Sequence, residues 1–382
     1  MKRLGCLWMS LVLLLGFLPL RAKAAGPEVK AKSAVLMDVA TGTVLYESNS
    51  HEALPPASVT KVMTLLLIME AIDSGAIGWN DTVTTSEAAA AKGGSQVFLK
   101  VGEQMCVADM VKSIAVSSAN DCACAMAEHI AGSESAFVEK MNARAKELGM
   151  ENTHFVNCTG LDDDPDAAKH RTSAYDIALM SRELLKEHPD IKKYTTIWMD
   201  TIRDGTFGLS NTNKLVRFYP GTTGLKTGFT SGAGYCLSAS AQRDGMELVA
   251  VTMGCESSAV RNAACKSLLD YGFANYALIN PTPEGNLTVP VKLGKKETVR
   301  VIPAAEGVML VEKSQKNLIR LQTELDERVD APVSRGQRLG TMRIFAEEQV
   351  LSEIPLVAEE TVERLTWWDI FLMLLRRVCM KE

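Results

Sequence analysis

The stretch LPPASVTKVMTLLLIMEAI, residues 54–72, predicts a helix at the centre of the fold. Two prolines stand in front of a nearly all-apolar run, and proline before such a run marks the start of a helix. Apolar side chains cover all sides of this helix, which is typical of a helix buried in the middle of a domain. Ser58 and Lys61 then share one face of its first turn, because side chains three residues apart return to the same side.

The patterns around this helix predict an α+β fold with an antiparallel sheet flanked by helices. Strands are expected at residues 33–38, 43–47, 224–230, 235–241 and 247–254, and helices at 107–148, 172–186 and 258–271. Asp244-Gly245 predicts a tight hairpin between the last two strands. The length of 382 residues suggests two domains, at roughly 100–200 residues per domain.

A cluster of proline, glycine and asparagine at residues 280–286 indicates a linker. Beyond it, short alternations of Val, Leu and Ile between turns predict a small all-β domain over residues 280–358. We therefore expect a first domain over residues 25–279, this second domain, and a terminal helix within residues 359–382.

Residues 1–24 are typical of an export signal. Lys2 and Arg3 precede an apolar run, and Ala22-Lys23-Ala24 provides the small residues that a signal peptidase requires, so cleavage is expected after Ala24. The alternative is an uncleaved membrane anchor. In either case we expect the bulk of the chain on the outer face of the cytoplasmic membrane or in the cell wall space.

The C-terminal segment predicts an amphipathic helix lying in a membrane interface. On a helical projection Trp367, Phe371 and Leu375 share the apolar face, whereas Asp369 and Arg376 lie on the other. Tryptophan is common at that depth of a membrane, and the segment is too short and too polar to cross a bilayer. The alternative is a helix that packs on the protein or on a second copy of it.

The composition excludes several classes of protein. With 47% hydrophobic and 23% charged residues, the chain is typical of a folded protein. Its net charge of −5 argues against nucleic acid as a partner, because a nucleic-acid binder needs a basic surface. The five histidines have no zinc-binding spacing and the nine cysteines are too scattered for a disulfide scaffold, so neither a metal nor a cofactor is implied.

Ser58 and Lys61 are candidates for nucleophilic catalysis. A serine hydroxyl attacks only when a base takes its proton, and Lys61 can be that base if it is neutral. Burial and a second nearby cation would both lower its pKa, and the free N–H groups at a helix start suit a developing oxyanion. The spacing alone also fits a capping serine beside a surface lysine.

Two further motifs could complete such a site. Ser118-Ala119-Asn120 offers a hydroxyl to relay a proton and an amide to fix a lysine and a substrate amide. Lys226-Thr227-Gly228 offers a cation and a hydroxyl to a carboxylate, and its glycine would let a substrate backbone lie close to the strand. Taken singly, the first motif also fits a helix start and the second a strand end.

In this order, the three motifs match the signature of penicillin-binding proteins and serine β-lactamases. The chain resembles the D-alanyl-D-alanine carboxypeptidases, the low-molecular-mass penicillin-binding proteins, over nearly all of its mature length. The resemblance is carried by residues 57–61, 118–121, 160–162, 211–215, 224–230 and 233–237. It implies a β-lactamase/transpeptidase-like catalytic domain, and the β-domain and terminal helix also match the family's layout.

The resemblance implies a role for each catalytic residue. Ser58 attacks the carbonyl between the two terminal D-alanines of a peptidoglycan stem peptide, and Lys61 is its general base. Ser118 and Lys226 assist proton delivery to the departing D-alanine, with Asn120 in the same site. Water then releases the acyl-enzyme, whereas β-lactam antibiotics acylate the serine and leave slowly.

It also implies how the substrate is held. Thr227 and Arg261 bind its terminal carboxylate, and Lys226 and Gly228 lie along it on the same strand. The backbone N–H groups of the nucleophile and of a residue near Thr230 form the oxyanion hole. The sequence departs from the family pattern at three positions. Ala119 stands where many relatives have glycine, and Phe229 and Thr159 stand where some relatives have histidine. These differences put the rate of deacylation in doubt, but not the class of reaction.

Two alternatives use the same residues differently. A β-lactamase of this fold would carry a glutamate that activates the deacylating water, and no convincing candidate lies between Asn120 and Lys226. The other alternative is a non-catalytic wall-binding or β-lactam-sensing protein. The presence of four intact residues speaks against it, namely Ser58, Lys61, Ser118 and Lys226.

Overall fold

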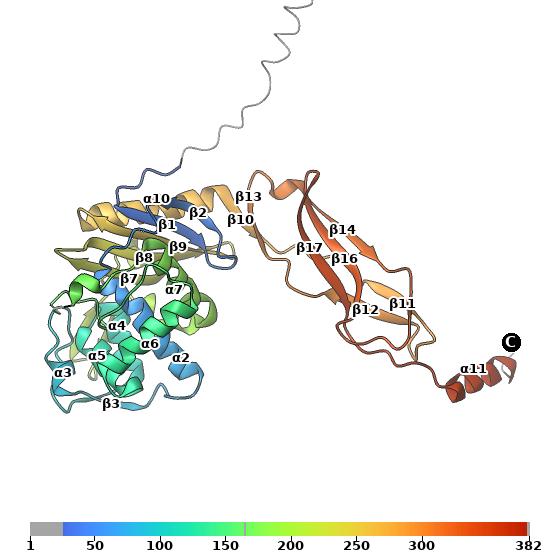
Figure 1. Ribbon diagram of the computed structural model, residues 1–382, viewed down its shortest axis with the longest axis horizontal. Coiled ribbons are helices and arrows are strands. Elements are labelled where there is room, and N and C mark those ends of the chain that lie inside the picture. The colour runs from blue at the N-terminus through green and yellow to red at the C-terminus, as the bar shows by residue number, and fades with distance from the viewer. Residues whose placement is uncertain (1–25, 164–165, 380–382) are drawn as a thin grey trace, which may run out of the picture.

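The structure is a computed structural model that describes residues 26–163 and 166–379. The expected export signal lies outside these residues. A five-stranded antiparallel sheet forms the centre of the first domain (Figure 1). Its strands, in spatial order, are β2 (Val44–Ser48), β1 (Ser33–Asp38), β9 (Met246–Cys255), β8 (Gly234–Arg243) and β7 (Thr222–Thr230). β7 is therefore an edge strand whose outer backbone faces no other strand of this sheet.

Helices cover both faces of the sheet. On one face α10 (Ser258–Asn275) packs against β1, β8 and β9, and Leu36 and Leu248 contribute to the core there. On the other face α7 (Ala174–Glu187) contacts the same strands, and Val35 and Val249 contribute to a larger core. Neighbouring residues of one strand thus enter different cores, as alternation along a strand requires.

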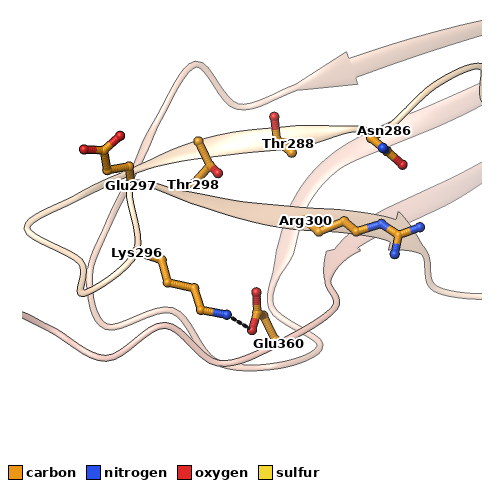
Figure 2. A pocket seen from close by; sticks show the side chains of 7 residues that line it. All are labelled: Asn286, Thr288, Lys296, Glu297, Thr298, Arg300 and Glu360. Carbon is orange, nitrogen blue, oxygen red and sulfur yellow. Dashed lines mark hydrogen bonds and ion pairs between the residues drawn. The ribbon is translucent and has the colours of Figure 1, made fainter.

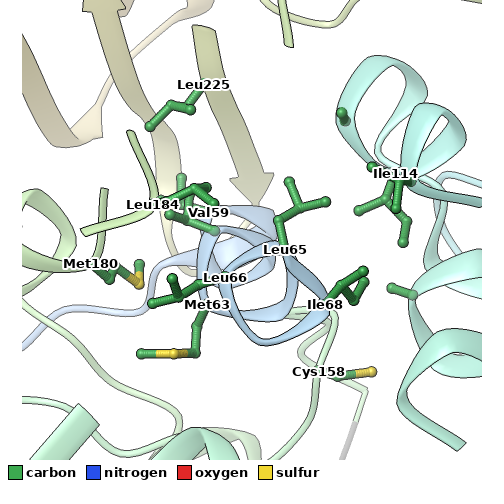
Figure 3. Packing of buried hydrophobic residues seen from close by; sticks show 14 of the residues in the cluster. Val59, Met63, Leu65, Leu66, Ile68, Ile114, Cys158, Met180, Leu184 and Leu225 are labelled. Atoms are coloured by element: carbon green, nitrogen blue, oxygen red, sulfur yellow. The ribbon is translucent and has the colours of Figure 1, made fainter. Parts of the chain in front are cut away.

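The predicted central helix is present. It begins with one 3₁₀ turn, η1 (Ala57–Thr60), and continues as α2 (Lys61–Asp73). Figure 3 shows Leu65, Leu66 and Ile68 projecting from it in different directions into the surrounding core. The all-round apolar pattern of the sequence therefore corresponds to burial on all sides.

The helical region predicted over residues 107–148 is divided into three helices. These are α4 (Val107–Ser117), α5 (Asn120–Ala131) and α6 (Glu134–Glu147). Ser118 and Gly132 interrupt it in the left-handed region, with φ of 62° and 79°. The helical character of this range is confirmed, and the two interruptions, which the pattern does not locate, let the chain reverse direction and pack α5 against α4 and α6.

Several short elements have no strong sequence pattern and were not predicted. They are β3 (Thr82–Thr84), α3 (Glu87–Ala90), β4 (Gln104–Cys106), η2 (Ala167–Lys169), η3 (Pro189–Ile191), α8 (Lys192–Thr195), β5 (Met199–Ile202), β6 (Phe207–Ser210) and α9 (Leu215–Phe218). β3 pairs with β4 and β5 pairs with β6.

The C-terminal part is β-rich, as predicted. Its six-stranded sheet has the order β14 (Ile319–Leu325), β16 (Arg338–Ala346), β17 (Gln349–Ala358), β12 (Thr298–Pro303), β11 (Thr288–Lys292) and β15 (Val329–Asp330). β10 (Tyr276–Ile279), which directly follows α10, pairs with β13 (Met309–Glu312), and η4 (Lys316–Leu318) precedes β14. The alternating residues of these strands enclose a separate core that includes Val289, Val299 and Leu356.

The terminal helix α11 (Trp367–Cys379) lies at the far end of the β-domain (Figure 1). Thr366 and Asp369 cap it reciprocally: Thr366 Oγ1 accepts from the Asp369 N–H at 3.2 Å, and Asp369 Oδ2 accepts from the Thr366 N–H at 2.8 Å. In the described part of the chain, no helix combines the length and the apolar character needed to span a bilayer.

Candidate active site

The start of α2 brings Ser58 and Lys61 together, as their spacing predicts. Lys61 Nζ lies 3.0 Å from Ser58 Oγ and donates a hydrogen bond to the carbonyl of Thr159 at 2.7 Å. Lys61 is completely buried, whereas Ser58 is partly exposed. The hydroxyl can therefore meet a substrate while the amine stays away from bulk water.

Burial sets the charge of this lysine. It lowers the pKa of Lys61 from 10.5 to about 7, against the opposing influence of Cys158 and Asp121. A neutral amine has two N–H groups and one lone pair. The Thr159 carbonyl accepts a hydrogen bond from one of these N–H groups. The lone pair of Lys61 is not used in that hydrogen bond, so it remains available to take the Ser58 proton.

Lys226 supplies the second amine of the site. It lies in β7, is 1% exposed, and donates to the Thr227 carbonyl at 2.9 Å. Burial, followed by the positive charges of Lys61 and Arg261, holds the pKa of Lys226 well below its usual value. Lys226 is thus close enough to feel the charges of both Lys61 and Arg261, although the three residues are separated in sequence.

Ser118 and Asn120 lie at the junction of α4 and α5 rather than within one helix. Ser118 is 3% exposed, and its left-handed backbone ends α4. Asn120 opens α5, and its Nδ2 donates to the Gly93 carbonyl at 2.7 Å. Its Oδ1 is buried and has no partner among the described residues, so it remains available to an N–H donor of a ligand.

Asp121, the next residue, fixes the loop that faces this junction. Its carboxylate accepts from the backbone N–H groups of Val97 at 3.1 Å and Leu99 at 3.0 Å, and from its own neighbour Cys122 at 2.9 Å. The loop carbonyl of Ser95 in turn accepts from the Asn120 N–H at 2.7 Å. Asp121 therefore positions Asn120 through the loop, a role that the spacing of the motif did not reveal.

Gly228 allows β7 to approach the nucleophile turn. A Cβ at this position would lie 2.6 Å from the Pro56 carbonyl oxygen and 3.1 Å from the Ser58 backbone nitrogen. The sequence suggested that Gly228 lets a substrate backbone lie close to the strand. In the structure, the backbone that lies close to Gly228 is the protein's own, at Pro56 and Ser58. The Thr227 hydroxyl, on the same strand, donates to Thr212 Oγ1 at 2.7 Å.

Arg261 projects from the first turns of α10 and is only 5% exposed. Its guanidinium donates to Asn262 Oδ1 at 3.1 Å and lies 5.9 Å from the ring of Tyr235. No ion pair with a carboxylate is found for it among the described residues, and burial lowers its pKa. Thr230, at the end of β7, accepts from the Ala233 N–H at 3.2 Å.

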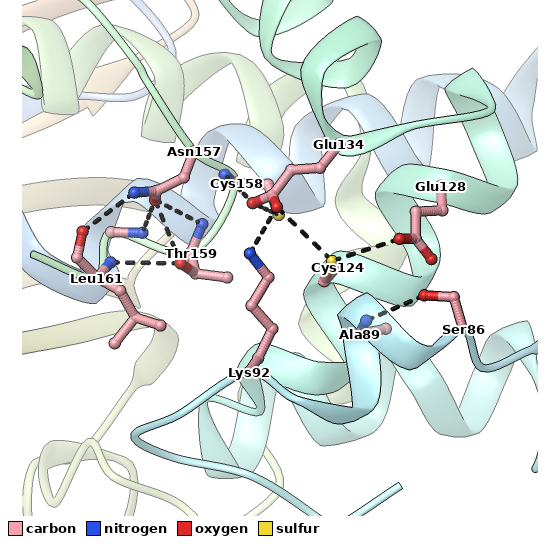
Figure 4. A network of polar contacts seen from close by, with 11 residues as sticks. Ser86, Ala89, Lys92, Cys124, Glu128, Glu134, Asn157, Cys158, Thr159 and Leu161 are labelled. Atoms are coloured by element: carbon pink, nitrogen blue, oxygen red, sulfur yellow. Dashed lines mark hydrogen bonds and ion pairs between the residues drawn. The ribbon is translucent and has the colours of Figure 1, made fainter. Parts of the chain in front are cut away.

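A partly buried polar network lies next to the Thr159 segment (Figure 4). Glu134 accepts from Lys92 Nζ at 2.6 Å and from the Cys158 backbone N–H at 3.3 Å. The Cys158 carbonyl accepts from the Thr64 hydroxyl at 2.6 Å. This network holds the segment whose next carbonyl binds Lys61, and no sequence pattern indicated it beyond the position of Thr159 in the resemblance.

A pocket of about 430 Å³ lies elsewhere, on the surface of the β-domain (Figure 2). It is lined by polar side chains, and Lys296 forms an ion pair with Glu360 there. Arg300 pairs with Glu359 close by. Its charges are therefore largely neutralised within the protein, and the candidate catalytic side chains lie on the other domain.

A serine hydroxyl lies beside a buried lysine amine, an arrangement that suits a serine hydrolase. Residues 21–257 match the family model described as D-alanyl-D-alanine carboxypeptidase, and residues 276–364 match the C-terminal domain of penicillin-binding protein 5. The chain belongs to this family of D-alanyl-D-alanine carboxypeptidases and is a serine carboxypeptidase.

Individual relatives support the same conclusion. The chain is 44% identical to D-alanyl-D-alanine carboxypeptidase DacF of Bacillus subtilis over 95% of both chains, and 34% identical to DacC of Escherichia coli over 91% of this chain and 89% of the relative. Penicillin-binding protein 5 of Haemophilus influenzae has a similar structure, with a TM-score of 0.74, 31% identity and coverage of 88% of this chain and 99% of the other. Penicillin-binding protein D2 of Listeria monocytogenes, solved in an ampicillin-bound form, has a TM-score of 0.59 and 30% identity, over 64% of this chain and 98% of the other.

Proposed function

We propose that Ser58 is the nucleophile of this carboxypeptidase and that Lys61 is its general base. Ser58 Oγ attacks the carbonyl carbon between the two terminal D-alanines of a peptidoglycan stem peptide, and its proton passes to Lys61 Nζ. The carbonyl oxygen becomes an oxyanion held by the backbone N–H groups of Ser58 and of the strand residue that follows Lys226-Thr227-Gly228, near Thr230. The observation that carries this proposal is the 3.0 Å contact between a partly exposed hydroxyl and a buried amine with a pKa of about 7.

The second half of acylation uses the neighbouring polar groups. When the tetrahedral intermediate collapses, the C–N bond breaks and the departing D-alanine amine needs a proton. We propose that this proton returns from Lys61 through Ser118, and that Lys226 assists its delivery. Water then attacks the acyl-enzyme, with a base accepting its proton, and restores the Ser58 hydroxyl.

We propose that the substrate lies along β7 as an additional strand. The edge position of β7 leaves backbone groups for an extended peptide, and Asn120 Oδ1 is a buried acceptor without a partner among the described residues. Arg261 and the Thr227 hydroxyl are suited to the terminal carboxylate, because Arg261 is a buried cation whose described neighbours leave its charge unbalanced. β-Lactam antibiotics would acylate the same serine.

We further propose that residues 25–279 form the catalytic unit, residues 280–358 a separate β-domain, and residues 359–382 the segment that contacts the membrane. Trp367 and Phe371 of α11 are 65% and 48% exposed, which supports burial against a lipid surface. The enzyme would then act on the cell wall from the outer face of the cytoplasmic membrane.

Two measurements on one protein test the catalytic assignment. Purified protein is expected to release D-alanine from diacetyl-Lys-D-Ala-D-Ala, and mass spectrometry after exposure to penicillin should locate the adduct on Ser58. Ser58→Ala should lose both. Persistent D-alanine release by Ser58→Ala, or an adduct on another residue, would refute the assignment, whereas rapid penicillin turnover would favour the β-lactamase alternative.

A further inference from the structure

The peptide bond in front of Ser58 is held by two side chains that have no assigned catalytic role: Thr60, which lies between Ser58 and Lys61 in the first motif, and His170, which lies outside the three motifs. The Thr60 hydroxyl donates to the Ala57 carbonyl at 2.8 Å, and Thr60 is completely buried. In a trans peptide the C=O and N–H of one planar unit point in opposite directions. Fixing the Ala57 carbonyl therefore also fixes the direction of the Ser58 N–H.

The conformation of this peptide needs support. Ala57 has a φ of 49°, a left-handed value that a residue with a Cβ rarely adopts. Strained backbone of this kind persists only where its surroundings impose it. Gly160 backs the same carbonyl so closely that a Cβ at position 160 would lie 1.8 Å from the Ala57 oxygen.

A histidine determines which way the Thr60 hydroxyl points. His170 Nε2 lies 2.8 Å from Thr60 Oγ1, and the Val156 backbone N–H donates to His170 Nδ1 at 3.1 Å. A backbone N–H can only donate, so Nδ1 carries the lone pair and the ring proton is on Nε2. His170 thus donates to Thr60, which leaves the Thr60 proton for the Ala57 carbonyl.

All the hydrogen bonds in this series run in one direction. They lead from the Val156 N–H through His170 and Thr60 to the Ala57 carbonyl, and the Ser58 N–H lies at the opposite end of the last peptide. The Ser58 nitrogen lies beside Gly228 of β7. Among the described residues no hydrogen-bond acceptor for this N–H is found.

We propose that Thr60 and His170 are positioning residues that aim the Ser58 N–H at the oxyanion formed during acylation. This proposal rests on the assignment of Ser58 as the nucleophile. Neither side chain touches the substrate. Their effect is exerted in the transition state, because the Ser58 N–H interacts more strongly with the developing oxyanion than with the ground-state carbonyl.

The test separates binding from acylation. A labelled penicillin is mixed rapidly with enzyme, and the dependence of the rate on concentration gives the non-covalent dissociation constant and the acylation rate constant. Thr60→Val keeps the shape and removes the hydroxyl, so the acylation rate constant is expected to fall on the order of 10- to 100-fold. The dissociation constant should stay within about twofold, and Thr60→Ser should restore most of the rate.

A second pair of variants tests the histidine. His170→Gln keeps one donor and one acceptor and should retain more of the acylation rate than His170→Leu, which keeps neither. Thr252→Val is the matched control: Thr252 is a fully buried threonine of β9 whose hydroxyl contacts Cys265 instead of the nucleophile turn. Its acylation rate constant should equal that of the wild type.

The outcomes distinguish the two proposals. An acylation rate constant of Thr60→Val equal to that of the wild type, or lowered no more than in Thr252→Val, would overturn the positioning role. Equal activity of His170→Leu and His170→Gln would overturn it as well, and this comparison remains possible should Thr60→Val not fold. Failure of the wild type to form an adduct on Ser58 would instead overturn the assignment of the nucleophile.

Discussion

Burial prevents two lysines of the candidate active site from behaving as ordinary cations. Lys61 is enclosed by the cores beside α2, and Lys226 by the sheet and the nucleophile turn. Each lysine loses solvation of its charged form, and Lys226 also experiences the positive charges of its two neighbours. An amine that is neutral close to pH 7 can act as a base without a histidine.

The pKa of Lys61 predicts how acylation depends on pH. Below about pH 7 the amine is protonated and cannot accept the Ser58 proton, so the second-order rate constant for acylation should rise with pH and reach half its plateau near pH 7. Stopped-flow measurement of the acylation rate constant between pH 5 and pH 9 tests this pH dependence. Lys61→Arg should be inactive throughout, and a rate constant that still rises about tenfold per pH unit up to pH 9 would show that Lys61 is not the neutral base.

At the scale of elements, the site depends on the contact between β7 and η1. Gly228 makes this contact possible, since its missing Cβ leaves room for the Pro56 carbonyl and the Ser58 nitrogen. The same strand carries Lys226, so the distance from β7 to η1 also sets the distance between the two amines. The α4–α5 junction contributes the third side of the site through Ser118 and Asn120.

Gly228→Ala should move β7 away from the nucleophile turn. A displacement of about 1 Å at reacting groups lowers rates on the order of 100-fold, and we expect a loss of acylation rate of that size. Gly232→Ala, in the turn that follows β7, is the control, because a Cβ there meets no atom within 4 Å. Circular dichroism should show both variants folded; equal acylation rates would mean that the contact does not control the reaction.

At the scale of the whole molecule, the β-domain extends from the catalytic domain, and α11 lies at its far end (Figure 1). The aromatic side chains of α11 contact one another: the Trp367 and Trp368 rings are stacked 3.9 Å apart, and Phe371 meets Trp368 edge-on. These aromatic side chains are exposed, and α11 belongs to a different part of the chain from the catalytic domain, so its proposed membrane contact can be tested apart from catalysis.

We expect Phe371→Ser combined with Leu375→Ser to weaken binding to vesicles containing anionic phospholipid on the order of 100-fold, because two half-exposed apolar side chains lose their place in the interface. Sedimentation with vesicles measures this. D-Alanine release from a soluble peptide should not change. Leu318→Ser with Val350→Ser, exposed apolar positions of the β-domain, is the control, and an equal loss of binding there would argue against α11 as the anchor.

Local patterns were sufficient for much of this architecture. The central helix, the strands and the β-rich C-terminal part follow from periodicity, proline and turn residues, which act within a few positions of the chain. The spacing of Ser58 and Lys61 is likewise a property of one helical turn. The left-handed backbone of Ser118 was missed, because serine carries no signal for that conformation.

Contacts across the sequence lie beyond such patterns. The carbonyl that accepts from Lys61 belongs to Thr159, 98 positions further along the chain. The histidine that contacts Thr60 is 110 positions away from it. Residue type and spacing predict neither the position of the Thr159 carbonyl nor the tautomer of the His170 ring. Both arise from how the loops pack against α2, and burial by the same packing lowers the pKa of Lys61.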